Sequence, residues 1–289
     1  MASMRDIKRR KESIQSTGQI TKAMKLVATV KLQKAKSRAE NSQPYFNAMY
    51  AAVKAMLGKS EAIEHPYLQQ GTSPKKGIIV MTSNRGLAGG YNSNIIKLVT
   101  GSGFKKEDVV LYAVGRKGKD FFARRGYDVR ADYSEVMNEP MYSDAAEIGK
   151  RVLEDFEKGE IGEIYLAYTV FKNTVSHIPT FIRLLPIVPE ETEGEEQEQA
   201  DKLTLMTYEP EAEEALGLII PKYINSLIYG GLVQSLASEI GARMQAMDSA
   251  TNNAEEMISG LTLKYNRARQ SSITQELTEI IAGANAINE

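Results

Sequence analysis

Apolar residues recur every three or four positions near the end of the chain. Over residues 211–286 the steps alternate between three and four, which is the pattern of a narrow coiled-coil seam. No proline follows Pro221, so nothing after it interrupts a continuous helix, which would be about 110 Å long over this span. A long helix folded back into a bundle would show a similar pattern. The seam residues are Val233, Leu236, Ile240, Met244, Met247, Thr251, Ala254, Ile258, Leu261, Tyr265 and Ala268.

A second seam marks residues 1–58, which we also predict to form a long helix. Gly58 can end this helix, and Pro44 lies off the seam, where it costs the helix one hydrogen bond. Two long helices with apolar stripes at opposite ends of one chain predict an intramolecular antiparallel coiled coil. The seam residues are Ala28, Leu32, Ala35, Ala39, Ser42, Phe46, Met49, Val53 and Met56.

The middle of the chain alternates short β-rich apolar runs with helical patterns. We predict strands at residues 77–82, 109–114, 164–170 and 180–187, and helices at 92–99, 115–125 and 144–158. Such alternation favours a Rossmann-like α/β domain on a mostly parallel sheet. The run around His177 and Pro179 is expected to form an antiparallel pair at one edge. The predicted fold is therefore an α/β domain, residues 72–208, between two coiled-coil helices, residues 1–58 and 209–289.

The charge of the chain is unevenly distributed although its net charge is only −1. Residues 1–38 hold eleven Lys or Arg against Asp6 and Glu12, whereas residues 209–289 hold five against eleven acids. Opposite charge at the two ends favours their pairing, although each exposed ion pair contributes only about 0.2–1 kcal/mol. The segment 190–201 carries seven acids and no base, and we interpret it as a disordered surface loop.

Residue types that carry catalysis are scarce. The chain has no cysteine, which excludes disulfides and thiolate metal sites, and its two histidines, His65 and His177, lie in different segments. The glycine-rich run 83–90 follows a predicted strand, but it lacks a Gly-Lys-Ser/Thr ending and a clean Gly-x-Gly-x-x-Gly. We therefore interpret its glycines as serving a tight strand-to-helix turn or a close backbone contact. No window holds about 18 uninterrupted apolar residues, so no membrane span is expected. We predict no catalytic residue, metal site or cofactor.

Three stretches resemble the γ subunit of F-type ATP synthases. Residues 268–284 read ARQSSITQELTEIIAGA, like the C-terminal signature of that family, and residues 19–28 read QITKAMKLVA, like its N-terminal helix. Residues 83–92 resemble the family's loop after the first strand, with Asn84 and Ala88 where many members have an acid and a cysteine. The resemblance spans the whole chain in the right order and points to a bacterial member.

The resemblance implies a central stalk, the rotor of the F1Fo complex, which couples ion flow to ATP synthesis and performs no bond chemistry itself. Its implied partners are three α and three β subunits, the ε subunit and the ring of c subunits, with one copy of this chain per complex. The implied location is the cytoplasmic face of the bacterial plasma membrane, as a peripheral subunit without a transmembrane segment.

By matching position, the family's polar contacts to a β-subunit loop fall on Arg243, Gln270 and Thr274, and Met24 falls near the β subunit's acidic hinge. A basic shaft face is expected on the same N-terminal helix. The alternative for each of these residues is an ordinary exposed position on a helix. The residues of the basic face are Arg9, Arg10, Lys11, Lys22 and Lys25.

Two other functions remain open from the sequence. A nucleotide-binding enzyme would hold its ligand in the α/β domain, and a basic coiled coil could tether nucleic acid through its N-terminal cluster. The cluster lacks interleaved aromatic residues, and the overall charge is close to neutral, so we expect no nucleic acid partner.

Overall fold

A computed structural model describes residues 4–58, 65–187 and 212–288, and the acidic segment 190–201 lies outside these ranges. The chain divides into two compact units, one made of Met1–Thr29 and Arg243–Glu289 and the other of Val30–Ala242. We refer to them as the two-helix unit and the sheet unit. The predicted segment boundaries at residues 58, 72 and 208 stay a prediction.

The sheet unit is built on five strands in the order β3-β2-β1-β4-β5. The first four in this order run parallel, and β5 pairs antiparallel with β4 at one edge, as the His177 region predicted. A Rossmann-like α/β domain was therefore correctly predicted. The strands are β1 (Lys76–Met81), β2 (Val109–Val114), β3 (Asp128–Asp132), β4 (Glu163–Phe171) and β5 (His177–Leu185).

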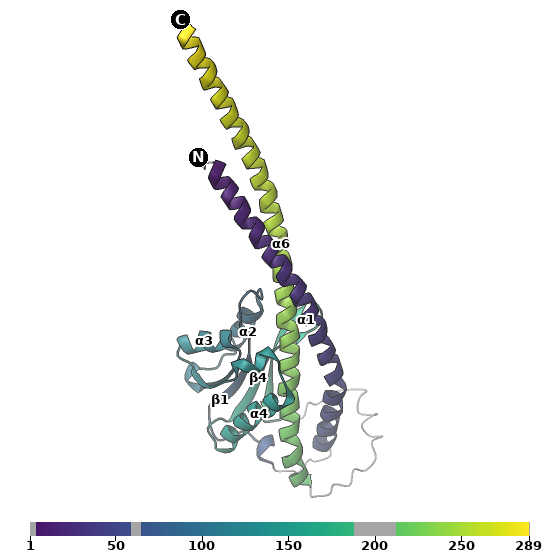
Figure 1. Ribbon diagram of the computed structural model, residues 1–289. Coiled ribbons are helices and arrows are strands. Elements are labelled where there is room, and N and C mark those ends of the chain that lie inside the picture. Colours follow the sequence, from purple (N-terminus) through teal and green to yellow (C-terminus); the bar gives the residue numbers. More distant parts are fainter. Residues whose placement is uncertain (1–3, 59–64, 188–211, 289) are drawn as a thin grey trace. The chain divides into compact units, whose positions relative to one another are not determined.

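Helices cover both faces of the sheet, which is why β1 and β2 are apolar along almost their whole length. On one face, α2 (Tyr91–Thr100) and α3 (Arg116–Arg124) pack Ile95, Val99 and Phe122 against strand residues. On the other face, α4 (Tyr142–Glu157) and α6 (Ala212–Asn288) pack against the alternate residues of the same strands. Figure 1 shows the sheet between these helices. Short 3₁₀ helices lie at Pro66–Leu68, Lys106–Asp108 and Ser134–Asn138.

The structure adds one strand that the sequence did not predict. β3 reads DVRAD, its five residues are exposed or half-buried, and it pairs with β2 alone. Three of its five residues are charged, so it contains no apolar run that would predict a strand. A strand at the edge of a sheet can form from such a sequence because few of its side chains are buried.

The two long helices were correctly predicted. The first, α1, spans Met4–Gly58 with Pro44 inside it, and α6 spans Ala212–Asn288 with Pro221 inside it. Every predicted seam residue of α6 is buried or half-buried, from Val233 to Ala268. On α1 the same holds from Ala28 to Val53, while the side chain of Met56 lies outside the described residues.

Within the sheet unit, α1 and α6 approach closely. A Cβ placed on Gly230 of α6 would lie 3.2 Å from the ring of Phe46 on α1. Phe46 also lies 6.3 Å from the ring of Tyr229, measured between centroids. Small residues on one helix therefore admit an aromatic residue of the other. The core of this unit also takes in Leu216, Ile220, Ile224, Ile228 and Leu232 of α6, all fully buried.

Candidate interaction surface

The two-helix unit holds all nine residues that the sequence singled out for binding. Its helices meet through small and polar residues. Thr21 of α1 and Thr251 of α6, each 8% exposed, share a hydrogen bond of 2.8 Å between their hydroxyls. One turn further, a Cβ on Gly18 would lie 3.3 Å from the Cβ of Ala254. These contacts confirm antiparallel packing in this unit, since residue numbers fall on α1 as they rise on α6.

Two further contacts tie the helices together in this unit. The Lys25 ammonium donates to the Asp248 carboxylate at 2.5 Å, with both side chains partly exposed. The Thr29 hydroxyl donates to the sulfur of Met244 at 3.4 Å. Because hydrogen bonds and ion pairs demand particular geometries, these polar contacts set the register of the seam more strictly than its small apolar residues can.

The four predicted contact residues fall into two places. Met24 and Arg243 are half-buried, whereas Gln270 and Thr274 are exposed. On a continuous helix, 27 residues of separation place Gln270 about 40 Å from Arg243. The structure therefore does not bring the four residues into one site. Met24 lies on α1, and on α6 the residue Arg243 lies far from Gln270 and Thr274.

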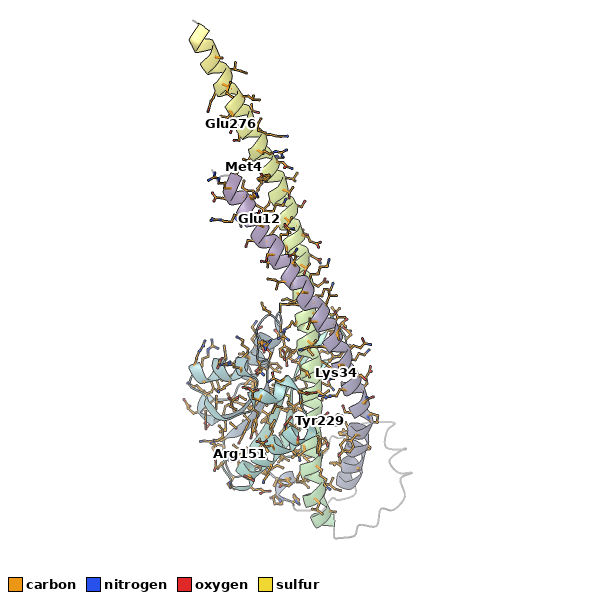
Figure 2. The ribbon with its side chains drawn as sticks, viewed as in Figure 1. Met4, Glu12, Lys34, Arg151, Tyr229 and Glu276 are labelled. Carbon is orange, nitrogen blue, oxygen red and sulfur yellow. The ribbon has the colours of Figure 1, made fainter. Side chains whose placement is uncertain are left out.

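The end of α6 stands apart from α1 within this unit. Figure 2 shows the turns around Glu276 continuing past Met4, where α1 begins. Apolar side chains here are about half exposed or more, and no other helix in the described part of the chain covers them. This exposure makes the end of α6 a candidate interaction surface. The exposed residues are Ile273, Leu277, Ile280 and Ile281.

The predicted basic face is mostly open to solvent. Arg9, Arg10 and Lys22 are exposed, and Lys11 and Lys25 are half-buried. Arg9 lies 3.7 Å from Asp6 on the same helix. The pairing of Lys25 with Asp248 was missed from the sequence, although the opposite charge of the two chain ends was a signal for contacts of this kind.

In the sheet unit, the glycine-rich loop after β1 is organised by its own side chains. The Asn92 side chain accepts from the backbone N–H of Ser83 at 2.9 Å, and the Asn84 carboxamide bonds to Ser134 and Arg116. Leu87 has a φ of 65° and Gly89 a φ of 54°, so the chain turns tightly here. The predicted turn role of this loop is therefore confirmed.

Several buried ionisable groups of the sheet unit bond to other residues of the same unit. Asp155, 1% exposed, accepts from the hydroxyl of Tyr112 at 2.5 Å and lies 3.5 Å and 3.7 Å from Arg151 and Arg130. Burial, aided by that hydrogen bond, raises the pKa of Tyr112. Burial lowers the pKa of His177. Among the described residues, no three His, Asp or Glu side chains cluster in a way that could hold a metal ion.

Comparison with known proteins places the chain in a family. A family model described as ATP synthase matches residues 3–287. The ATP synthase gamma chain of Lachnoclostridium phytofermentans is 75% identical over 291 residues and covers 100% of both chains. The chain belongs to the ATP synthase gamma chain family. Another relative, the sodium ion specific gamma chain of Acetobacterium woodii, is 44% identical and covers 99% of each chain.

Solved structures agree with this membership of the gamma chain family. The central stalk and c-ring structure of Tetrahymena thermophila mitochondrial ATP synthase includes a chain with a TM-score of 0.61 and 25% identity, covering 80% of this chain and 99% of that one. A chain of the Euglena gracilis mitochondrial enzyme has a TM-score of 0.71 at 17% identity, covering 98% and 94%, and it supports the fold alone. The comparisons favour neither the nucleotide-binding enzyme nor the nucleic acid tether.

Within the described residues, one helical stretch, Ala215–Ala284 of α6, is long and apolar enough to cross a membrane by length and composition. The expectation of no membrane span rested on uninterrupted apolar runs, which this stretch does not have. About 44% of its most apolar window is buried inside the structure. In the sheet unit, the apolar residues of α6 pack on the sheet, as those of a soluble core helix do.

Proposed function

We propose that this gamma chain is the non-catalytic shaft of a rotary ATP synthase. Its partners are three α subunits, three β subunits, the ε subunit and a ring of c subunits, and each complex holds one copy. The complex stands on the cytoplasmic face of the bacterial plasma membrane, where this chain is peripheral. The observation that carries the proposal is the two-helix unit, whose α6 ends in exposed apolar turns, in a chain 75% identical to a gamma chain.

The shaft acts by making different contacts with each of the three β subunits. A single asymmetric chain at the centre of three identical β subunits presents a different surface to each of them. Each contact stabilises one conformation of its β subunit over another, and rotation exchanges the three contacts. The exposed apolar end of α6 suits this task, because apolar packing is non-directional and can re-form at each angle.

The contact residues of the proposal are Met24, Arg243, Gln270 and Thr274. Met24 and Arg243 serve one level of the shaft, and Gln270 and Thr274 serve another level nearer its end. The basic residues Arg9, Arg10, Lys11, Lys22 and Lys25 face acidic segments of β. Lys25 reaches such a segment while keeping Asp248 as its resting partner, since its side chain is 41% exposed.

Reconstitution tests the function. The purified chain alone is expected to hydrolyse no ATP, and on mixing with α and β subunits it is expected to enter a complex at one copy per three β. Mass measurement of the intact complex gives that ratio. ATP hydrolysis by the isolated chain, or failure to join α and β, would contradict the proposal.

Met24→Lys tests the first contact level. The new ammonium is expected to form an ionic contact with an acidic segment of a moving partner, so ATP-driven ion pumping falls more than ATP hydrolysis does. Ala23→Lys adds the same charge at the neighbouring exposed position and serves as the control. If vesicles carrying Met24→Lys enzyme pump as many ions per ATP as wild type, Met24 is not at that contact.

A further inference from the structure

In the sheet unit, β4 extends past the end of its neighbour β1 and bonds to α6 there. The last β4 residue paired with β1 is Ala167. Beyond it, the Thr169 N–H donates to the Ser235 hydroxyl at 3.2 Å, and the Ser238 hydroxyl donates to the Thr169 carbonyl at 3.2 Å. All three bonded residues are buried. For this part of β4, α6 therefore takes the place of a neighbouring strand and satisfies the backbone groups that β1 leaves unpaired.

Gly241, one turn further along α6, receives the end of the β4–β5 hairpin. His177, the first residue of β5, pairs with Phe171, the last residue of β4. A Cβ on Gly241 would lie 2.6 Å from Nε2 of His177 and 3.3 Å from the Phe171 ring. Ser235, Ser238 and Gly241 are spaced three residues apart, so one face of α6 carries the whole contact. A side chain at position 241 would fill the space that the hairpin occupies.

The closed contact has no place for a charge on the imidazole. Nε2 of His177 is buried, and no described residue forms a hydrogen bond with it. The ionisable residues adjoining the contact along the chain are Lys172, after β4, and Glu239 and Arg243, on α6. Burial alone lowers the pKa of His177, so none of these three charges accounts for the shift. A proton on Nε2 needs a hydrogen-bond acceptor or solvent, and the imidazole reaches solvent only when the hairpin leaves α6.

We propose that the β4–β5 hairpin is a pH-sensitive latch on α6, closed while His177 is neutral and released when its imidazole takes up a proton. Release uncovers the α6 face from Ser235 to Gly241, whereas Gly231 stays packed against β1 and β4. Low pH therefore shortens the stretch of α6 that the sheet braces by about 9 Å. In a rotating shaft a shorter brace gives a more compliant helix. This consequence rests on the proposed function, whereas the latch itself does not.

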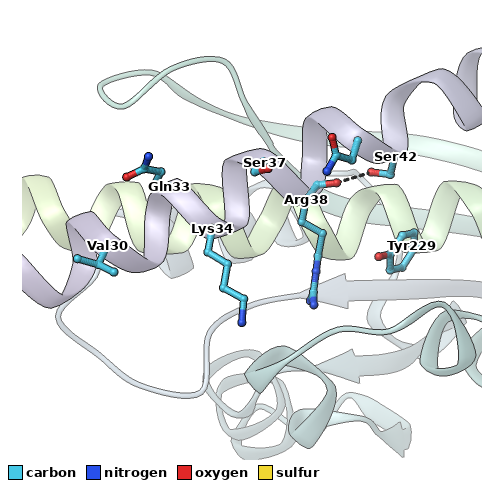
Figure 3. A pocket seen from close by; sticks show the side chains of 8 residues that line it. Val30, Gln33, Lys34, Ser37, Arg38, Ser42 and Tyr229 are labelled. Atoms are coloured by element: carbon cyan, nitrogen blue, oxygen red, sulfur yellow. Dashed lines mark hydrogen bonds between the residues drawn. The ribbon is translucent and has the colours of Figure 1, made fainter.

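Thiol labelling of the full chain measures the opening. The chain has no cysteine, so Ser238→Cys places its only thiol inside the closed contact, where the serine is 0% exposed. Ser37→Cys is the exposed reference, because Ser37 lines an open groove of about 780 Å³ beside α1 (Figure 3), and it reports how the reagent itself responds to pH. Ser226→Cys is the buried control on α6, since Ser226 is 1% exposed and bonds to the Lys222 carbonyl rather than to the hairpin.

The expected signal is faster labelling of the latch thiol in acid. In the open hairpin His177 regains its ordinary pKa of 6.5, so protons favour the open form below that pH. Between about pH 7.5 and 5.5, the labelling rate of Ser238→Cys relative to Ser37→Cys should rise about three- to tenfold. Ser226→Cys should show no such rise. Adding His177→Phe to Ser238→Cys should remove it, because the new ring keeps the packing but takes up no proton.

Three outcomes overturn the latch: the same relative rate at both pH values, a rise that persists with His177→Phe, or an equal rise for Ser226→Cys, which indicates loosening of the whole unit. Hydrogen exchange at the Thr169 amide, compared between wild type and His177→Phe at each pH, gives a second readout that needs no introduced thiol. It keeps the test open where Ser238→Cys fails to fold. Because the isolated chain is measured, failure to assemble with α and β subunits removes the proposed function and leaves the latch to be judged by labelling.

Discussion

At the scale of single residues, the carboxylate of Asp155 is almost fully buried, at 1% exposure. It accepts from Tyr112 and faces two guanidinium groups, Arg130 and Arg151. Asp155→Asn keeps the shape but leaves the half-buried Arg130 with less compensation, so we expect the free energy of unfolding to fall by about 3 kcal/mol. Urea denaturation followed by circular dichroism measures it.

Asp128→Asn is the matched control for Asp155. Asp128 also lies near Arg130, at 3.2 Å, but its side chain is 49% exposed. An exposed pair contributes less than about 1 kcal/mol, so this change should be nearly neutral. Equal losses in the two variants would show that burial does not set the contribution of the Arg130 network.

His177 gives a pH dependence of stability. Its ring lies 5.9 Å from that of Phe171, and a Cβ on Gly241 of α6 would lie 2.6 Å from its Nε2. Burial lowers the pKa of His177 below its usual 6.5, so the unfolded chain takes up a proton more readily than the folded one. Protonation of His177 therefore has little effect on the free energy of unfolding above pH 6.5. As the pH drops below 6.5, it lowers the free energy of unfolding. His177→Phe should flatten the dependence of the urea midpoint on pH between about 5.5 and 7; a slope identical to wild type would assign that dependence to other groups.

At the scale of elements, sequence reasoning succeeded where burial imposes a pattern. β1 and β2 are covered on both faces and read as continuous apolar runs, and the α6 seam repeats over about ten turns. It failed at β3, where Arg130 and two aspartates occupy an edge that needs few buried side chains. It also could not pair Lys25 with Asp248, because register between two separate helices depends on contacts rather than on either pattern alone.

Replacing glycine by alanine is predicted to have opposite effects on stability at two positions of the sheet unit. A Cβ on Gly149 of α4 would lie 1.9 Å from the Asn225 side-chain oxygen and 3.5 Å from Ile228. Gly149→Ala should therefore destabilise by about 1–3 kcal/mol through overpacking. Among the described residues, a Cβ on Gly217 of α6 would meet His65 alone, at 3.5 Å, so Gly217→Ala should stabilise by up to about 1 kcal/mol through helix propensity. Thermal unfolding separates the two, and stabilisation by Gly149→Ala would refute the close approach of α4 to α6.

At the scale of the whole molecule, the apolar patterns of α1 and α6 do not show where one compact unit ends and the other begins. The α6 seam repeats without a break across Ala242 and Arg243, and the α1 seam continues across Thr29 and Val30. The boundary follows from what lies beside the helices, since only the sheet unit contains strands among the described residues. Helix periodicity reports which face of a helix is buried and is silent about what buries it.

This division predicts that residues 30–242 fold without the rest of the chain. Both large apolar clusters, including five fully buried residues of α6 from Leu216 to Leu232, lie inside that range, so removing residues 1–29 and 243–289 takes away no member of either core. The fragment should unfold in a single cooperative transition, with a urea m-value reduced in proportion to the surface it buries. Gly149→Ala should lower its midpoint as it does in the full chain, because α4 and its α6 contact are both retained. A fragment with helical circular dichroism but a broad, non-cooperative transition would show that the two-helix unit is needed to complete the sheet unit.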